Sequence, residues 1–366
     1  MKKFLIFILL TFISITSAYA LESNILPSQT GVVKNIEYVD LSQSDMMQTK
    51  QVCTIKLTSG ENKNDIVVLD NMLTGNPYYD INLKEGTKVI LHAEDSDDGI
   101  IYSIEDIKRS GTLIWLSLLF FGLLIYIGKK KGLYSLVSIL LTCLLIFHIL
   151  SPMILLGINP IIATVLICLI ATAVTMYLVG GFNKKSTSAT IGCTLSLITA
   201  GLLSFIAVKS ASLNGFAGEN SMFLYSAHPE LNFISIAIST MILATLGAVM
   251  DVGMSIASTI NEIHAIDGTK TVKELFVSGM NVGRDIIGTM ANTLILVYLG
   301  GSLPLLLLAS NIDLQKFFNL NQVVTEIASA LIGSCAIVLC VPITAFVASE
   351  LIKNIPDKYD FTELKD

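Results

Sequence analysis

Charged residues are scarce in this sequence. They make up 14% of its 366 residues, whereas hydrophobic residues make up 53% and the mean hydropathy is +0.71. A soluble globular chain carries about 25% charged residues, so this composition excludes a chain made only of ordinary soluble domains. The charges that remain are acidic on balance, with a net charge of −6. No basic cluster of the kind that binds nucleic acid is present, and we expect no nucleic-acid partner.

The negative charge is concentrated near the N-terminus. Residues 21–110 hold 15 Asp and Glu against 8 Lys and Arg, a net charge of −7. Residues 111–366 hold 14 against 13, a net charge of −1. The sequence therefore divides into an acidic segment and a longer, nearly neutral hydrophobic segment.

Cysteine chemistry is also limited. Cys53 is alone in the acidic segment, and the other five cysteines lie in apolar stretches: Cys143, Cys168, Cys193, Cys335 and Cys340. A disulfide within the acidic segment is therefore excluded, and no pair has the spacing of metal ligands. We expect buried, unreactive thiols, with no metal site and no cofactor.

Catalytic motifs are missing as well. The sequence contains no His-Glu-x-x-His, no Gly-x-Ser-x-Gly and no Gly-x-Gly-Asp. These motifs supply the zinc ligands, nucleophile or paired carboxylates of several hydrolase classes. We therefore expect no enzymatic activity and no catalytic residues.

The first 20 residues have the three parts of a secretory signal peptide. Lys2 and Lys3 form a positive start, residues 4–15 an apolar core, and Ala18-Tyr19-Ala20 a small-x-small cleavage site. An uncleaved anchor with its N-terminus inside the cell fits the same residues. Both interpretations place residue 21 onward outside.

Short alternating segments with turn signals fill the acidic part, residues 21–110. Turns rich in Gly, Asn, Asp and Pro separate five candidate strands: Gly31–Val39, Val52–Thr58, Asp65–Leu69, Lys88–Ala93 and Ile100–Ile104. Five short strands in so few residues predict a small all-β domain, an OB-like barrel, held on the extracytoplasmic side.

Apolar stretches dominate residues 111–351. Each is long enough to cross a hydrocarbon core of about 30 Å as a helix. The seven predicted spans are Thr112–Gly128, Leu133–Leu150, Ile158–Gly180, Ala189–Val208, Leu231–Ser255, Ile286–Leu308 and Val323–Leu351. The predicted fold is a polytopic α-helical membrane protein with about seven transmembrane helices, an exported β-domain and a tail at residues 352–366.

The distribution of lysines gives the orientation. If residue 110 lies outside, the inner loops and the tail carry ten lysines, and the outer loops carry only Lys209 and Lys316. This asymmetry follows the positive-inside rule. We therefore expect a multi-pass protein of the cell membrane, with the β-domain extracytoplasmic and the C-terminus cytoplasmic.

Three charges interrupt the predicted spans. Asp251 lies late in the fifth span, and Arg284 and Asp285 lie at the start of the sixth. Helical spacing places Asp251 on one face with Ser255, Ser258 and Glu262, and Asp285 on one face with Thr289 and Asn292. Asp251, Arg284, Asp285, Thr289 and Asn292 therefore form a candidate intramembrane polar site.

Two interpretations of this charged hairpin stay open. In the first, Arg284 is the counter-ion of a structural pair, and Gly279-x-x-x-Gly283 lets the helices approach closely. In the second, Asp251 and Asp285 line a substrate site, an ion site or a proton relay. The predicted depth near the inner side counts against transport, because transporter sites lie near the midplane.

The same hairpin carries a family resemblance. LGAVMDVGMSIAS begins at Leu246 and SGMNVGRDIIGTMANTLIL at Ser278, with GSLPLLLL following at Gly301. These segments resemble the YibE/F-like family of bacterial multi-span membrane proteins. Weaker similarity to the family extends over the preceding sequence from residue 30. The resemblance implies a multi-span membrane protein, and it assigns no catalytic or binding residues.

Two functions fit these observations. The first is a transporter of a small solute or ion, motivated by the polar stripes inside a helical bundle. The second is a membrane scaffold or assembly factor whose exported domain binds a membrane or exported protein partner. Either function places the chain in the lipid bilayer.

Overall fold

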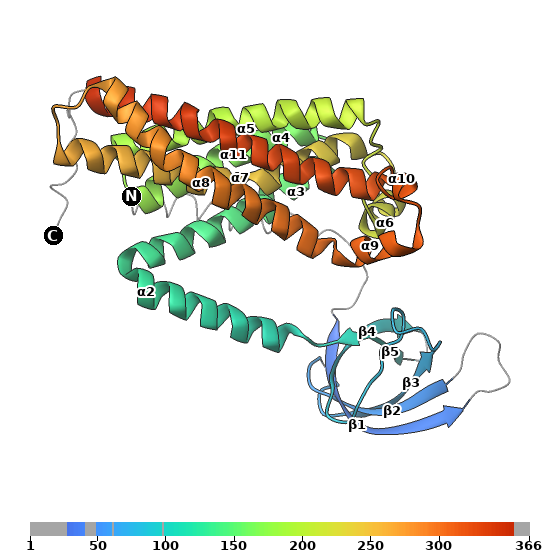
Figure 1. The fold of residues 1–366 in the computed structure, drawn as a ribbon. Coiled ribbons are helices and arrows are strands. Elements are labelled where there is room, and N and C mark those ends of the chain that lie inside the picture. The colour runs from blue at the N-terminus through green and yellow to red at the C-terminus, as the bar shows by residue number, and fades with distance from the viewer. Residues whose placement is uncertain (1–27, 41–48, 61, 97–98, 355–366) are drawn as a thin grey trace. The chain divides into compact units, whose positions relative to one another are not determined.

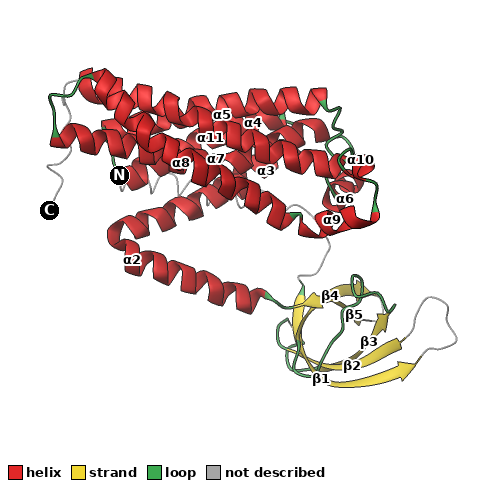
Figure 2. Ribbon diagram, viewed as in Figure 1, coloured by secondary structure: helices red, strands yellow, loops and turns green. Residues whose placement is uncertain are grey.

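The computed structural model describes residues 28–40, 49–60, 62–96 and 99–354. The expected signal segment and most of the expected tail lie outside these residues. The chain divides into two compact units, residues 1–123 and 124–366, which are described separately. Figure 2 shows the strands of the N-terminal unit and, from α2 (Ser110–Leu145) onward, helices.

Five antiparallel strands form the N-terminal unit. They are β1 (Gln29–Asp40), β2 (Thr49–Leu57), β3 (Ile66–Leu73), β4 (Lys88–Ser96) and β5 (Gly99–Ile107). Their order in the sheet is β3-β2-β1-β4-β5. Each contains or overlaps one of the predicted strands, so the prediction of a small all-β domain is confirmed.

The sheet curls into a nearly closed barrel. Its two edge strands, β3 and β5, come into contact, and Asn62 before β3 donates a hydrogen bond from Nδ2 to the Tyr102 hydroxyl of β5 at 3.1 Å. Bringing β3 against β5 completes a cyclic order 1-2-3-5-4, which is the strand order of an OB-like barrel.

The barrel interior follows from strand alternation. Cys53, Ile55 and Leu57 of β2 point inward at every second position and are fully buried, with Val33, Leu83, Val89 and Leu91 beside them. Burial raises the pKa of the Cys53 thiol, which keeps it neutral and unreactive. The expectation of a buried cysteine is therefore confirmed in this domain.

Helices make up the remainder of the described chain. They are α2 (Ser110–Leu145), the π-helix η1 (Ile146–Leu150), α3 (Ser151–Leu155), α4 (Pro160–Gly180), α5 (Lys184–Ser210), α6 (Glu219–Ala227), α7 (Phe233–Ile266), α8 (Val272–Gly301), α9 (Leu303–Leu308), the 3-10 helix η2 (Ala309–Asn311), α10 (Leu314–Phe317) and α11 (Asn321–Asn354). Six helical stretches among them are long and apolar enough to cross a membrane.

The first of these six stretches contains two predicted spans. It runs for 46 residues, from Ser110 to Leu155, and its backbone breaks at Lys129, where φ is 50° and ψ is −129°. At Gly132 an added Cβ would collide with the Leu124 carbonyl, so the chain turns tightly around the three lysines. Two apolar arms joined by this bend agree with the expected number of about seven spans.

Close helix packing builds the centre of the bundle. Figure 1 shows α11 beside α5 and α8, and α7 also packs on α4, α5, α8 and α11. Gly192 of α5 lies against Thr344 of α11, and Gly253 of α7 lies against Cys193 of α5. Small residues let membrane helices approach in this way. Buried hydroxyls such as Ser196 and Thr245 donate to carbonyls of their own helices, which satisfies them inside the bundle.

Asparagine is the N-cap residue of three of the long helices. Asn159, Asn183 and Asn232 accept hydrogen bonds from backbone N–H groups in the first turns of α4, α5 and α7. Thr271 and Glu274 form a capping box at the start of α8. These caps satisfy otherwise orphaned amides and fix where each helix begins.

Candidate functional site

The predicted polar residues lie on α7 and α8, and both helices are longer than the predicted spans. The span predicted at Leu231–Ser255 continues in α7 to Ile266, and the span predicted at Ile286–Leu308 begins in α8 at Val272. The charged residues therefore lie near the middle of continuous helices rather than at their ends.

The depth of Asp251 follows from its neighbours on α5. The Cys193 thiol of α5 donates to the Val249 carbonyl of α7 at 3.3 Å, so the two residues are level. Lys184 marks the start of α5, and the rise from Lys184 to Cys193 is about 13 Å at 1.5 Å per residue. This is close to half of a hydrocarbon core of about 30 Å. Asp251, less than one turn from Val249 along α7, is therefore at about this distance from the level at which α5 begins.

Asp251 belongs to an exposed stripe of small and polar residues on α7. The exposed residues of this stripe are three, four or seven positions apart and comprise Thr240, Ala244, Gly247, Asp251, Ser255 and Glu262. The opposite side of the same helix is buried, with Val249, Val252 and Ile256 at 0% exposure. The stripe therefore faces away from the centre of the bundle, with a carboxylate in its middle.

A second exposed polar stripe runs along α8. It comprises Asn281, Arg284, Asp285, Gly288, Thr289 and Asn292. The buried residues of α8 are Leu275, Gly279 and Gly283, which pack on α7 and α11. All five predicted site residues are thus exposed on the surface of the helical unit, on two helices that pack together.

Within the part of the chain that the structure describes, the charged side chains of the two stripes form no ion pairs. Arg284 donates from Nη1 to Oδ1 of Asn281, three positions earlier on its own helix, at 3.0 Å. Among the described residues, no ion pair joins Arg284 to Asp251 or Asp285. Each charge exposed to lipid would cost about 2.5–3.5 kcal/mol on insertion scales. Water, a ligand or another protein surface is therefore needed to cover these stripes.

Two thiols meet behind the α7 stripe, which the sequence did not predict. Cys193 and Cys340 both donate to the Val249 carbonyl, at 3.3 and 3.6 Å, and Cys340 also contacts the Thr344 hydroxyl at 3.5 Å. Both thiols are fully buried, as is Cys168, whereas Cys143 and Cys335 are exposed. The expectation of buried thiols is thus wrong for those last two. The long sequence separation of Cys193 and Cys340 left no spacing signal that could have linked them.

Glu326 is another residue of interest that was not predicted from the sequence. It lines a largely apolar cavity of about 440 Å³ with Tyr298 of α8 and Phe317 of α10, between the last turns of α8 and the first turns of α11. Glu326 lies three positions into the span predicted at Val323–Leu351, so its charge at the start of an apolar run was visible in the sequence. It lies well away from Asp251 along the chain and does not join the predicted site residues.

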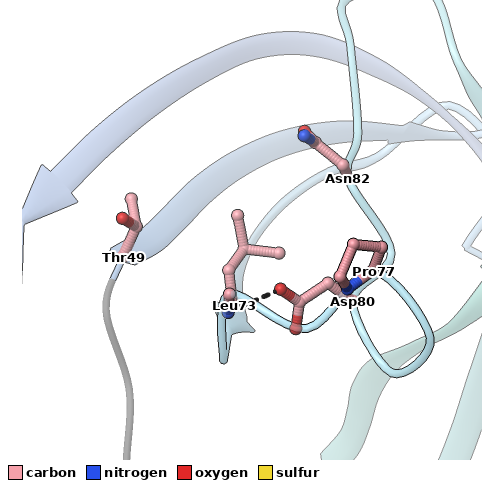
Figure 3. A pocket seen from close by; sticks show the side chains of 6 residues that line it. Thr49, Leu73, Pro77, Asp80 and Asn82 are labelled. Atoms are coloured by element: carbon pink, nitrogen blue, oxygen red, sulfur yellow. Dashed lines mark hydrogen bonds between the residues drawn. The ribbon is translucent and has the colours of Figure 1, made fainter. Parts of the chain in front are cut away.

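The exported domain has a cavity of its own, of about 370 Å³, lined by Thr49, Leu73, Gly75, Pro77, Asp80 and Asn82. Figure 3 shows Asp80 turned toward the loop backbone. The Gly75 amide donates to the Oδ2 atom of Asp80 at 2.8 Å. Its carboxylate also accepts from the amide and hydroxyl of Thr74 at 2.7 and 2.9 Å. These bonds hold the pKa of Asp80 below its ordinary value of 3.8. Asp80 thus shapes its own loop and leaves little acceptor capacity for a ligand.

Comparison with known proteins covers nearly the whole described chain. The model of the YibE/F-like protein family matches residues 116–354, and that of the YibE/F family N-terminal domain matches residues 28–107. No curated protein and no solved structure matches. The two matched regions correspond to the helical part and the barrel described above. The chain belongs to the YibE/F-like family.

Proposed function

We propose that this protein moves a small solute or ion across the membrane along the exposed stripe of α7, and that it is not an enzyme. The observation that carries the proposal is Asp251, a carboxylate that forms no ion pair with any described residue and lies near the middle of α7 on a helix face of small residues. We place it near the membrane midplane. Substrate and coupling-ion sites of transporters lie at this depth.

The surroundings of Asp251 support a path rather than a single buried charge. Gly247 and Ser255, one turn to either side, leave space along the helix, and an added Cβ at Gly247 would touch nothing within 4 Å. A carboxylate in this position can bind a cation or carry a proton. The positive charge of Arg284 on the neighbouring helix would influence whether cations or anions are transported.

Transport can be tested with purified full-length protein in proteoliposomes. Fluxes of monovalent cations, divalent cations, anions and small zwitterions should identify at least one transported species. Asp251→Asn should reduce that flux at least about tenfold, because the amide cannot carry the charge. Glu230→Gln makes the same chemical change on an exposed outer loop and should leave the flux unchanged. Absence of flux across the whole panel would refute the proposal.

A second candidate function rests on the surface of the barrel. The outward side of β3 exposes Ile66, Val68 and Met72 at 65%, 62% and 41%. An apolar row on an edge strand is typical of a surface that a partner covers. In this alternative the chain is a scaffold whose exported domain binds a membrane or exported protein.

A photo-crosslinking residue placed at Val68 tests the alternative in native membranes. A scaffold should give one reproducible crosslinked protein, and the same probe at exposed Lys34 of β1 should give none. Equal patterns from both positions would argue against a dedicated surface on β3.

A further inference from the structure

We propose that two copies of this chain associate through the exposed stripe of α8, around a two-fold axis along the membrane normal, with Arg284 of each copy facing Asp285 of the other. The proposal concerns assembly, and it does not depend on whether the protein transports anything.

The first observation is how little of α8 the bundle covers. Of its 30 residues, only Leu275, Gly279 and Gly283 are buried. They occupy a single face, one turn apart from one another. The side of the helix that carries the polar stripe is exposed, so another protein surface can lie against this side of α8 without displacing part of the bundle.

The second observation is where the polar residues lie relative to the buried face. At 100° per residue, Gly288 lies directly opposite the centre of that face, and Asn281 and Asn292 lie within about 40° of the same line. Asn281, Asp285, Gly288 and Asn292 repeat at intervals of four, three and four positions. This is the spacing of a seam between two helices. The polar stripe is thus centred where a neighbouring helix would approach most closely.

Arg284 and Asp285 flank this line on opposite sides, by about 40° and 60° respectively. In two parallel helices related by a two-fold axis, the left flank of one helix meets the right flank of the other at the same height. Arg284 of each copy therefore meets Asp285 of the other, and the interface has two identical ion pairs. Neither charge has an ion pair among the described residues of one chain, whereas two copies pair all four charges.

The central residues of the stripe fit close contact between helices. An added Cβ at Gly288 would meet nothing within 4 Å, so the backbone there is accessible to a neighbouring helix. Small residues allow such approach in membranes, and Asn side chains form hydrogen bonds across the seam. Lipid cannot provide these partners. The apolar segment of residues 4–15 also lacks the charges that would complement Arg284 and Asp285.

Charge reversal tests the pairing. Two differently tagged full-length copies are expressed together, and co-purification from mildly solubilised native membranes reports association. Arg284→Asp alone and Asp285→Arg alone place like charges face to face and should each weaken self-association at least about tenfold. Co-expression of the two single variants should restore it. The double variant should associate with itself and not with the wild type.

The pattern of rescue distinguishes pairing from general damage. Lys316→Glu, a charge reversal on the outer segment, should associate as the wild type does. Each variant is also checked for thermal unfolding in detergent. Normal self-association of both single variants, or no rescue when they are combined, would overturn the proposal. A monomeric wild type in native membranes would also overturn it.

A cysteine crosslink provides a second test that does not depend on charge. Gly288→Cys places a thiol on the two-fold axis, and mild copper-phenanthroline oxidation should join two copies by a disulfide. Gly247→Cys is the matched control on α7, because an added Cβ there is equally free of contacts. Wild type gives the background from native thiols. Equal crosslinking of both variants, or crosslinking of Gly288→Cys to a different protein, would refute the two-fold contact.

Discussion

At the scale of single residues, Gln51 shows how one buried amide can hold a barrel together. Its side chain is fully buried, donates to the Leu83 carbonyl at 3.1 Å and the Asn82 side chain at 3.1 Å, and accepts from the Leu83 amide at 3.2 Å and Asn71 at 2.9 Å. Every hydrogen-bonding position of this amide is used, so β2 is fixed to β3 and to the loop before β4.

Gln51→Leu should destabilise the exported domain by about 2–3 kcal/mol, because it leaves the buried Leu83 backbone groups without partners. Hydrogen exchange of the full chain should show faster exchange at the Leu83 amide and along β2. Glu37→Gln, on the exposed side of β1, is the control and should leave exchange unchanged. Equal protection in both variants would mean that the network contributes little.

We expect the loop that Asp80 holds through Thr74 and Gly75 to be sensitive to acid. Its folded pKa is lowered mainly by the Thr74 amide bond, so its contribution to stability is fully present above its ordinary pKa of 3.8. That contribution is lost as the pH falls through the lower folded value. Protection of the Thr74 and Gly75 amides, corrected for intrinsic exchange rates, should therefore decrease in that window. Asp80→Asn should show weaker protection at neutral pH and no acid dependence.

Some residues of the candidate site could be predicted from the sequence, whereas others depend on how the helices pack. Asp251, Arg284 and Asp285 could be singled out from the sequence, because a charged side chain in an apolar segment has a free-energy cost in the membrane whatever the helix packs against. Their lack of a mutual ion pair is a matter of helix rotation, which local spacing does not determine. Cys193 and Cys340 become a pair only through the packing of α5 on α11.

At the scale of helices, α7 offers two glycines with opposite surroundings. A Cβ at Gly253 would collide with the Cys193 sulfur, whereas a Cβ at Gly247 would meet nothing within 4 Å. Gly253 is therefore needed for the contact between α5 and α7, and Gly247 is not.

Gly253→Ala should destabilise the protein by about 1–3 kcal/mol, the usual cost of overpacking a core. Gly247→Ala should be neutral or slightly stabilising, because alanine is the better helix former. Thermal unfolding of the detergent-solubilised protein measures both. A destabilisation of equal size in the two variants would contradict the packing described for α5 and α7.

The strands and the apolar helices were predictable, whereas the ends of α7 and α8 were not. Hydropathy falls at Ser255, where the prediction ended the fifth span. The helix nevertheless continues to Ile266, because Ile256 and Ile260 still face the bundle and are fully buried. Tertiary contacts of this kind extend a helix beyond its apolar run.

At the scale of the whole molecule, the bend at Lys129 decides how many times the chain crosses the membrane. If both arms of the first helical stretch cross it, the described helices make seven crossings, and Ser110 and Asn354 lie on opposite sides. If the stretch crosses once, the described helices make six crossings, and Ser110 and Asn354 lie on the same side.

Labelling with an impermeant maleimide distinguishes the two arrangements. With seven crossings, Lys316→Cys should be labelled in intact cells, and Lys130→Cys should be labelled only after the cells are opened. Unmodified protein provides the background from Cys143 and Cys335. Labelling of Lys130→Cys in intact cells would contradict both the bend and the lysine asymmetry.

The glycine face of α8 has a consequence for motion. Helices that interlock through large side chains must separate their ridges before they can slide. Ile260 of α7 and Val341 of α11 fill the space that a Cβ would occupy at Gly279 and Gly283, so a shift of α8 along its own axis would press larger side chains against them. The two glycines thus fix the axial position of α8, and its displacement requires that it first separate from α7 and α11.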